Sequence, residues 1–172
     1  MLRNKLLLIS TLFLFLLQGC SSVMNKKQVT LPQHKLYAIG SFWNYTETPM
    51  AGLRAASIVE GVMAQHNINI SSMVGSSDQL EKSESKLSFL QNAKKQALQA
   101  KANYLITGDV QEWRYKTGID GEPVVSYSIK IIDLNSDQIV FSAIAAKSGW
   151  GHKSIGVVAQ EIAQELIPNF VQ

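Results

Sequence analysis

Apolar and polar residues alternate along residues 102–150 in a pattern that predicts three consecutive antiparallel strands. The apolar positions are Tyr104, Ile106 and Val110, then Val125, Tyr127, Ile129 and Ile131, then Ile139, Phe141, Ala143 and Ala145. A period of two turns one set of side chains toward a buried face and the other toward solvent or a partner. Residues typical of turns, at 118–123 and 135–137, separate the strands. The stretch therefore predicts an antiparallel meander.

Hydrophobic periodicity elsewhere predicts two strands and two helices before the meander and one helix after it. The expected elements are a strand over 34–42, a helix that Thr48 caps and Pro49 opens, a strand over 68–74, a helix over 78–100, and a helix that Ser154 caps and Pro168 ends. The order is β-α-β-α-β-β-β-α, and right-handed crossovers make the early strands parallel. The fold class is therefore α/β (α+β), with a mixed sheet, a C-terminal antiparallel meander and packed helices. The lysines at 82, 86, 94 and 95 are expected on a solvated helix face.

The N-terminal residues predict the cellular compartment to which the protein is exported. A basic start precedes an apolar run from Leu6 to Leu17, which is too short to span a bilayer and is typical of a secretory signal. The ending Leu17-Gln18-Gly19-Cys20 resembles a bacterial lipobox, which implies cleavage before Cys20 and acylation of that residue. The alternative is an ordinary signal peptide with a chance cysteine. Ser21 stands where an Asp commonly retains such proteins at the inner membrane, so we expect the outer membrane, facing the periplasm.

These features divide the chain into a signal peptide over 1–19, the lipidated Cys20 with a flexible tether over 20–32, and a single periplasmic domain over 33–172. The chain has 172 residues with 16 basic and 13 acidic side chains, a net charge of +3. Removal of Arg3 and Lys5 with the signal peptide leaves it nearly neutral. This balance does not suggest a nucleic-acid partner, which favours a concentrated basic face.

The sequence offers little catalytic chemistry. Cys20 is the single cysteine and the three histidines lack metal-ligand spacing, so neither a metal nor a cofactor is expected. The segment 149–154 does not match a phosphate-binding loop. Paired carboxylates could hydrolyse glycosides, but Asp120 and Glu122 lie at a turn tip, where solvation keeps acids ionised. The expected activity is therefore non-enzymatic.

Aromatic residues are the unusual part of the predicted surface. Trp113, Arg114 and Tyr115 follow one another on a strand and are interface candidates, although Trp113 could instead pack beneath a helix. Trp150 lies between Gly149 and Gly151, where a large aromatic ring suits contact with a partner or with lipid headgroups.

Two stretches carry a family resemblance. Phe42-x-Asn44-x-Thr46 followed by Ala51-Gly52-Leu53-Arg54-Ala55 is similar to the periplasmic domain of CsgG-like outer-membrane lipoproteins. The stretch from Thr107 to Pro123, with Glu112-Trp113-Arg114-Tyr115, and the later Ser148-Gly149-Trp150 resemble the PelC family of exopolysaccharide-export lipoproteins. The likeness covers nearly the whole mature chain.

The resemblance implies a homo-oligomeric ring, such as a dodecamer, anchored to the outer membrane by acyl chains. The ring would present an aromatic belt toward the lipid and an electronegative funnel toward the periplasm, and the funnel would guide a cationic amino-sugar polymer to an outer-membrane barrel during biofilm matrix secretion. Trp150 is the belt candidate, and Asp109, Asp120 and Glu122 are the funnel candidates. We expect the hairpin-tip acids and Trp150 at opposite ends of the meander. The alternatives are a regulator of a cell-envelope enzyme and a CsgG-like secretion accessory.

Overall fold

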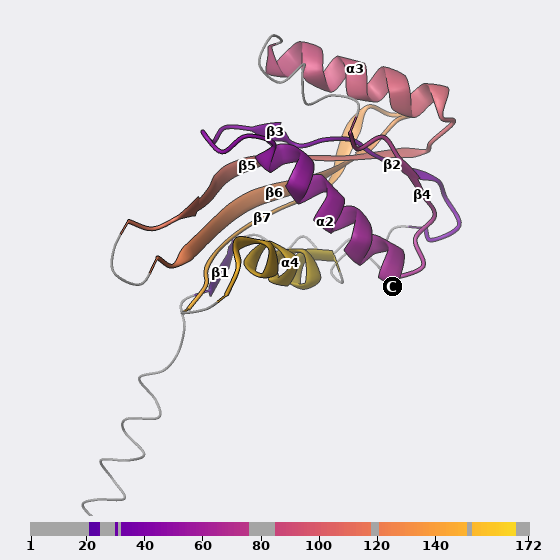
Figure 1. The fold of residues 1–172 in the computed structure, drawn as a ribbon. Helices are drawn as coiled ribbons and strands as arrows, with labels where there is room; N and C mark the ends of the chain where they lie inside the picture. The colour runs from indigo at the N-terminus through magenta and orange to yellow at the C-terminus, as the bar shows by residue number, and fades with distance from the viewer. Residues whose placement is uncertain are drawn as a thin grey trace, which may run out of the picture.

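The protein is described here by a computed structural model covering residues 21–24, 30, 32–75, 85–117, 121–150 and 153–167. The strands are β1 (Ser21–Met24), β2 (Tyr37–Ile39), β3 (Trp43–Asn44), β4 (Ile70–Ser72), β5 (Tyr104–Tyr115), β6 (Pro123–Asp133) and β7 (Gln138–Ser148). The helices are α2 (Ala51–Gln65), α3 (Lys86–Gln99) and α4 (Ile155–Leu166). One mixed sheet carries α2 and α4 on one face and α3 on the other (Figure 1).

The sheet has the strand order β1-β7-β6-β5-β2-β4, and β3 pairs with β5. β2 runs parallel to β4 and β5, while β5, β6 and β7 are antiparallel neighbours. The predicted fold class, a mixed sheet with a C-terminal meander and packed helices, is confirmed.

Burial in β6 follows the predicted alternation, whereas the start of β7 departs from it. Ile139 was predicted in the buried set but is 58% exposed, because a register shift between Ile131 and Ile132 places it opposite Ile132. Tyr127, Ile129 and Ile131 of β6 belong to the main core beneath α2 and α4. Ser126, Ser128 and Lys130 point to the opposite face, which α3 covers in part. The second face therefore carries a polar surface inside the fold, and this is where a charged cluster forms.

The start of α2 differs from the prediction. The helix begins at Ala51, and its N-cap residue is Met50, which has a φ of 63° and no side-chain capping bond. Thr48 does not cap the helix because its hydroxyl donates to the backbone oxygen of Trp113 at 2.6 Å. The side chain that favours a cap thus ties the loop before α2 to β5.

The other helices agree better with the sequence. Ser154 caps α4 as predicted, with its hydroxyl accepting from the backbone N–H of Val157. α3 begins at Lys86 with Ser85 as its cap, and the predicted start near residue 78 lies outside the described residues. None of the helices in the described ranges is long and apolar enough to cross a membrane.

Part of the expected tether is a strand. β1 pairs antiparallel with β7 along the edge of the sheet, with Ser21 opposite Lys147 and Met24 opposite Ile144. Backbone pairing restrains residues 21–24, where the sequence suggested a flexible segment. Cys20 and the signal peptide lie outside the described residues.

Candidate functional site

Trp150 is held at the end of β7 by its neighbour Gly149. The backbone N–H of Gly149 donates to the carbonyl oxygen of Pro123 at 2.8 Å. A Cβ atom at Gly149 would lie 2.6 Å from Pro123 Cγ and 2.7 Å from Val158 Cγ2, so only glycine fits there. Trp150 itself is 73% exposed. The backbone is therefore fixed at this point while the indole ring is presented to the outside.

Glu122, beside the β5–β6 turn, and Trp150 lie at the same end of the sheet. Val124, at the start of β6, pairs with Ser148, at the end of β7. The prediction that the acids and Trp150 lie at opposite ends of the meander is therefore wrong. Because β6 and β7 are antiparallel, β7 ends beside the start of β6. Asp120 lies outside the described residues.

Glu122 is not a free acid. Its carboxylate pairs with Lys116 at 2.8 Å, and its side chain is only 25% exposed. The ammonium group neutralises much of the charge that this residue would offer to a polymer. A funnel that used Glu122 would first have to compete with Lys116.

Other apolar side chains are exposed close to the end that carries Trp150. Tyr115 closes β5 and its hydroxyl accepts from the backbone N–H of Ile155 at 3.3 Å. Val157, in the first turn of α4, is also exposed. Arg114 is exposed and pairs with Glu112 at 3.1 Å. Trp150, Tyr115 and Val157 are exposed apolar side chains near this end of the sheet, which we call the aromatic end.

Trp113 belongs to the core and not to this surface. A β-bulge between Val110 and Glu112 shifts the alternation of β5 by one residue. Trp113 consequently joins Val110 beneath α2 and α4, and it is 2% exposed. Its indole Nε1 has no hydrogen-bond partner among the described residues. The structure thus supports the alternative in which Trp113 packs under a helix, since a core residue cannot contact a partner directly.

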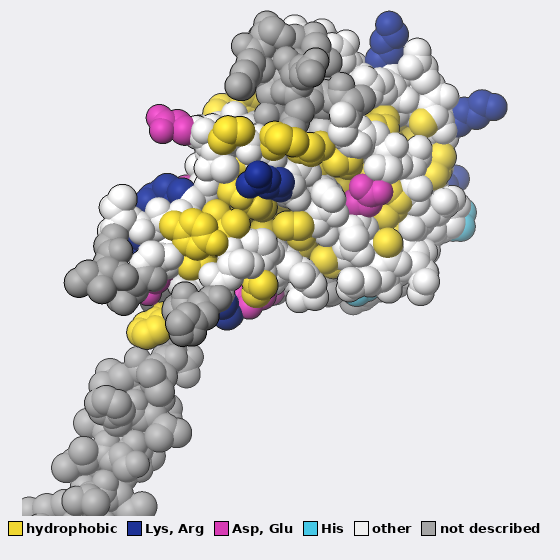
Figure 2. Space-filling view, in the orientation of Figure 1, with side chains coloured by type: hydrophobic (Ala, Val, Ile, Leu, Met, Phe, Trp, Pro, Cys, Tyr) yellow, Lys and Arg dark blue, Asp and Glu magenta, His cyan; other side chains and the backbone are white. Residues whose placement is uncertain are grey.

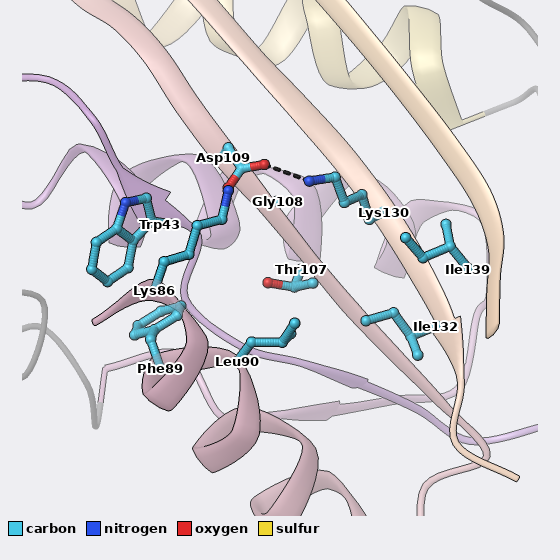
Figure 3. A pocket seen from close by; sticks show the side chains of 10 residues that line it. All are labelled: Trp43, Lys86, Phe89, Leu90, Thr107, Gly108, Asp109, Lys130, Ile132 and Ile139. Atoms are coloured by element: carbon cyan, nitrogen blue, oxygen red, sulfur yellow. Dashed lines mark hydrogen bonds and ion pairs between the residues drawn. The ribbon is translucent and has the colours of Figure 1, made fainter. Parts of the chain in front are cut away.

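Asp109 forms a buried ion-paired cluster on the opposite face of the sheet (Figure 3). One carboxylate oxygen lies 2.5 Å from Lys86 Nζ and the other 2.6 Å from Lys130 Nζ. The backbone N–H of Asp109 donates to the hydroxyl of Ser128 at 3.1 Å. Only 5% of the residue is exposed. Asp109 is therefore unsuited to an exposed ring of charge, in contrast to the funnel role suggested for it.

The ion pairs favour the charged forms of Asp109 and Lys86. Burial alone would raise the pKa of the Asp109 carboxyl, but hydrogen bonds from Lys130 and Lys86 outweigh burial and hold the pKa below its usual value. For Lys86, burial would lower the pKa, and the bonds to Asp109 and Tyr45 raise it instead. Two cations and one anion thus leave a single net positive charge at this site.

The lysines of this cluster were not identified from the sequence. Lys86 is exposed on α3, as predicted, with 43% of its side chain accessible, and its ammonium group also reaches Asp109 because the first turn of α3 packs over β5. Lys130 could have been found, since the strand period places it on the same face as Thr107, its pairing partner, and Asp109.

Charge elsewhere is dispersed. Figure 2 shows basic and acidic side chains scattered among hydrophobic ones, with no broad patch of one sign among the described residues of that face. Within the described ranges, no group of three or more His, Cys, Asp or Glu side chains is placed to hold a metal ion.

The fold resembles that of a solved bacterial lipoprotein. The chain has the architecture of lipoprotein GNA1162 from Neisseria meningitidis, with a TM-score of 0.54 over 78% of this chain and 99% of that one. The two share 10% sequence identity, so the likeness is one of fold. No protein-family model matches the chain, and no curated protein sequence matches it significantly.

A stronger likeness is to PelC from Paraburkholderia phytofirmans. The PelC dodecamer in space group P6 is 28% identical, with a TM-score of 0.71 over 90% of this chain and 100% of that one. A single-substitution variant of the same dodecamer is 29% identical, with a TM-score of 0.72 and the same coverage. The resemblance to PelC expected from the sequence is confirmed, and the chain is PelC-like in fold and in sequence.

Proposed function

We propose that the chain is a non-enzymatic, lipid-anchored accessory protein of exopolysaccharide export that works as a PelC-like ring at the outer membrane. The likeness to the PelC dodecamer carries this proposal, because it spans 90% of this chain and the whole of the PelC chain. The signal peptide and lipobox expected at residues 1–20 agree with an envelope lipoprotein.

The aromatic end is the surface we assign to the membrane. Trp150 and Tyr115 carry amphipathic rings of the kind that settle at lipid headgroups. The anchor supports the same orientation. Cys20 directly precedes Ser21 in the sequence, and Ser21 pairs with Lys147, close to Trp150. A lipid on Cys20 would therefore enter the membrane beside the aromatic end.

We further propose that the ring guides a cationic amino-sugar polymer. A ring repeats each acidic side chain in every copy, and such rings steer cations even when each subunit is nearly neutral. Asp120 is the funnel candidate that carries most weight, since Asp109 is buried and Glu122 pairs with Lys116. The polymer would pass from this ring to an outer-membrane barrel.

The mass of the mature domain tests the ring. Native mass spectrometry or light scattering on residues 21–172 should give a species of many copies, as in the PelC dodecamer. A monomer at high concentration would contradict the proposal and favour a regulator of a cell-envelope enzyme. Lipidated protein in detergent should be measured in parallel, because the anchor could be needed for assembly.

A further inference from the structure

A wide open groove lies beside α2, and none of the exposed side chains of the aromatic end lines it. Its volume is about 530 Å³. Half-buried aliphatic side chains from α2, from the loop after β4 and from the start of α4 form its walls, namely Leu53, Ile58, Val74 and Ile155. Figure 2 shows hydrophobic side chains gathered over this face of α2. We call this surface the α2 groove, and a contiguous apolar surface of this kind marks a place where another molecule binds.

Two hydrogen-bond donors without acceptors belong to this apolar surface. Arg54 lines the α2 groove and is exposed, and its guanidinium makes no ion pair or hydrogen bond with a residue that the structure describes. Trp113 lines the same groove, and its buried Nε1 has no partner among the described residues. A buried donor without a partner costs free energy, and an acceptor brought to it removes that cost. The surface that fits the α2 groove is therefore apolar and carries acceptors, with an acid opposite Arg54.

The position of the α2 groove on the subunit favours a neighbouring subunit as its occupant. The strands β5, β6 and β7 have one end at the aromatic end (Figure 1), so a subunit seated through Trp150 turns the faces of its sheet, and α2 with them, sideways. A cationic polymer is repelled by Arg54, and water is a poor solvent for aliphatic walls. A closed ring needs two different, complementary surfaces on every subunit, because each copy contacts the next one head to tail.

We infer that the α2 groove receives a second copy of this chain and is one of the two surfaces that close the ring. The inference rests on the ring proposed above and adds where its subunits meet. The neighbouring copy packs apolar side chains against Leu53, Ile58 and Ile155 and brings an acidic side chain to Arg54. Tryptophan and arginine are enriched among the residues that contribute most to protein–protein interfaces, and the α2 groove holds one of each within an apolar frame.

Charge substitutions test the α2 groove. Native mass spectrometry of the mature lipidated chain in detergent, over a series of concentrations, measures the concentration at which half of the ring dissociates. Arg54→Glu reverses the free charge and should raise this concentration at least about tenfold, and Ile58→Glu, which puts a carboxylate into an apolar wall, should act in the same direction. Lys95→Glu is the control, because it makes the same change of charge at an exposed position of α3, across the sheet from α2. It should leave the ring unchanged.

Crosslinking identifies the occupant. Photoreactive benzoylphenylalanine in place of Ser57, an exposed residue of the α2 groove, should give covalent dimers on irradiation, and the same group in place of Lys95 should not.

The outcomes separate this inference from the proposed function. A ring that persists in Arg54→Glu and Ile58→Glu, without dimers from position 57, would overturn the inference and leave the ring standing. Unmodified protein that stays monomeric would contradict the ring and the inference together. A crosslink confined to one chain, or loss of vesicle binding with the ring intact, would mean that another segment or lipid fills the α2 groove, and would overturn the inference as well. If Ile58→Glu fails to fold, Arg54→Glu decides, because Arg54 is exposed.

Discussion

The backbone N–H of Gly149 donates to the carbonyl oxygen of Pro123 at 2.8 Å, and this bond sets the Trp150 loop against the base of the β5–β6 hairpin. The proposed membrane contact and the acid-bearing hairpin consequently occupy one end of the sheet. In a ring seated on the membrane through Trp150, the start of β6 at Pro123 would face the membrane as well.

Replacement of the exposed indole should separate membrane seating from folding. We expect Trp150→Ala to change the free energy of unfolding by less than about 0.5 kcal/mol, as is usual at exposed positions. Binding of the domain to lipid vesicles should weaken clearly, because the ring that inserts at the headgroups is gone. Urea unfolding and vesicle sedimentation measure the two effects. Leu87→Ala is the matched control, since Leu87 is exposed on α3, across the sheet from α4. An equal loss of vesicle binding in both variants would argue against a special role for Trp150.

Replacement of the buried Trp113 should, in contrast to Trp150, lower the free energy of unfolding strongly. Trp113→Ala removes a fully buried ring, which costs about 3–5 kcal/mol. Trp113→Phe should cost much less, because the ring is largely kept and an unpaired buried donor, worth about 1–3 kcal/mol, disappears. Urea unfolding of both variants checks the order. A nearly neutral Trp113→Ala would mean that the side chain is not in the core.

The close packing around Gly149 gives a steric test. In Gly149→Ala the new Cβ meets Pro123 and Val158 at 2.6 and 2.7 Å, so the loop must move, at a cost of about 1–3 kcal/mol. We expect weaker vesicle binding in addition, because Trp150 moves with the loop. Gly156→Ala is the control: the nearest atom would be 3.9 Å away, and alanine is the better helix former by up to about 1 kcal/mol. Loss of vesicle binding in Gly156→Ala as well would remove the link to the loop.

The hairpin acids give a test in solution. Asp120→Asn combined with Glu122→Gln should weaken binding of a partly deacetylated amino-sugar polymer. Binding to the unmodified domain should also fall steeply with salt, because exposed charges are screened over about 8 Å at physiological ionic strength. Asp137→Asn is the control, since this exposed acid pairs with Lys94 at the β6–β7 turn. Binding that ignored both salt and the double substitution would contradict the funnel.

The sequence predicts those parts of the fold that depend on local pattern. The period of two along residues 124–131 places Tyr127, Ile129 and Ile131 in the core, as expected. Ser154 is recognisable as a cap because its hydroxyl bonds locally to the backbone N–H of Val157. In both cases the residue types that give the prediction lie within a few positions of each other, so the local pattern suffices.

The errors arise where a distant contact overrides the local pattern. A bulge after Val110 shifts by one residue which side chains of β5 face the core, and the surrounding residues carry no sequence signal for this extra position. Thr48 looks like a helix cap, yet it bonds to Trp113, far along the chain. Asp109 is a candidate for an exposed acid, yet lysines from α3 and β6 pair with it and only 5% of it is exposed. The fold class was therefore accessible from sequence, whereas the burial of Asp109 and the role of Thr48 depend on contacts between distant segments and were not.

The Asp109 cluster should make stability depend on pH in the acid range. Asp109→Asn leaves Lys86 and Lys130 without their carboxylate, and we expect a loss of about 1–3 kcal/mol at neutral pH. The folded-state pKa of Asp109 is lowered, so its stabilisation is present above the unfolded pKa of about 3.9 and is lost as the pH falls through the folded pKa. The difference in free energy of unfolding between the two proteins should therefore be largest near pH 7 and shrink below about pH 4. Urea unfolding at pH 7, 5, 4 and 3 measures it, with Asp137→Asn as the control at an exposed ion pair. A difference that stayed constant down to pH 3 would mean that the ionised carboxylate contributes nothing and that the amide disturbs the packing instead.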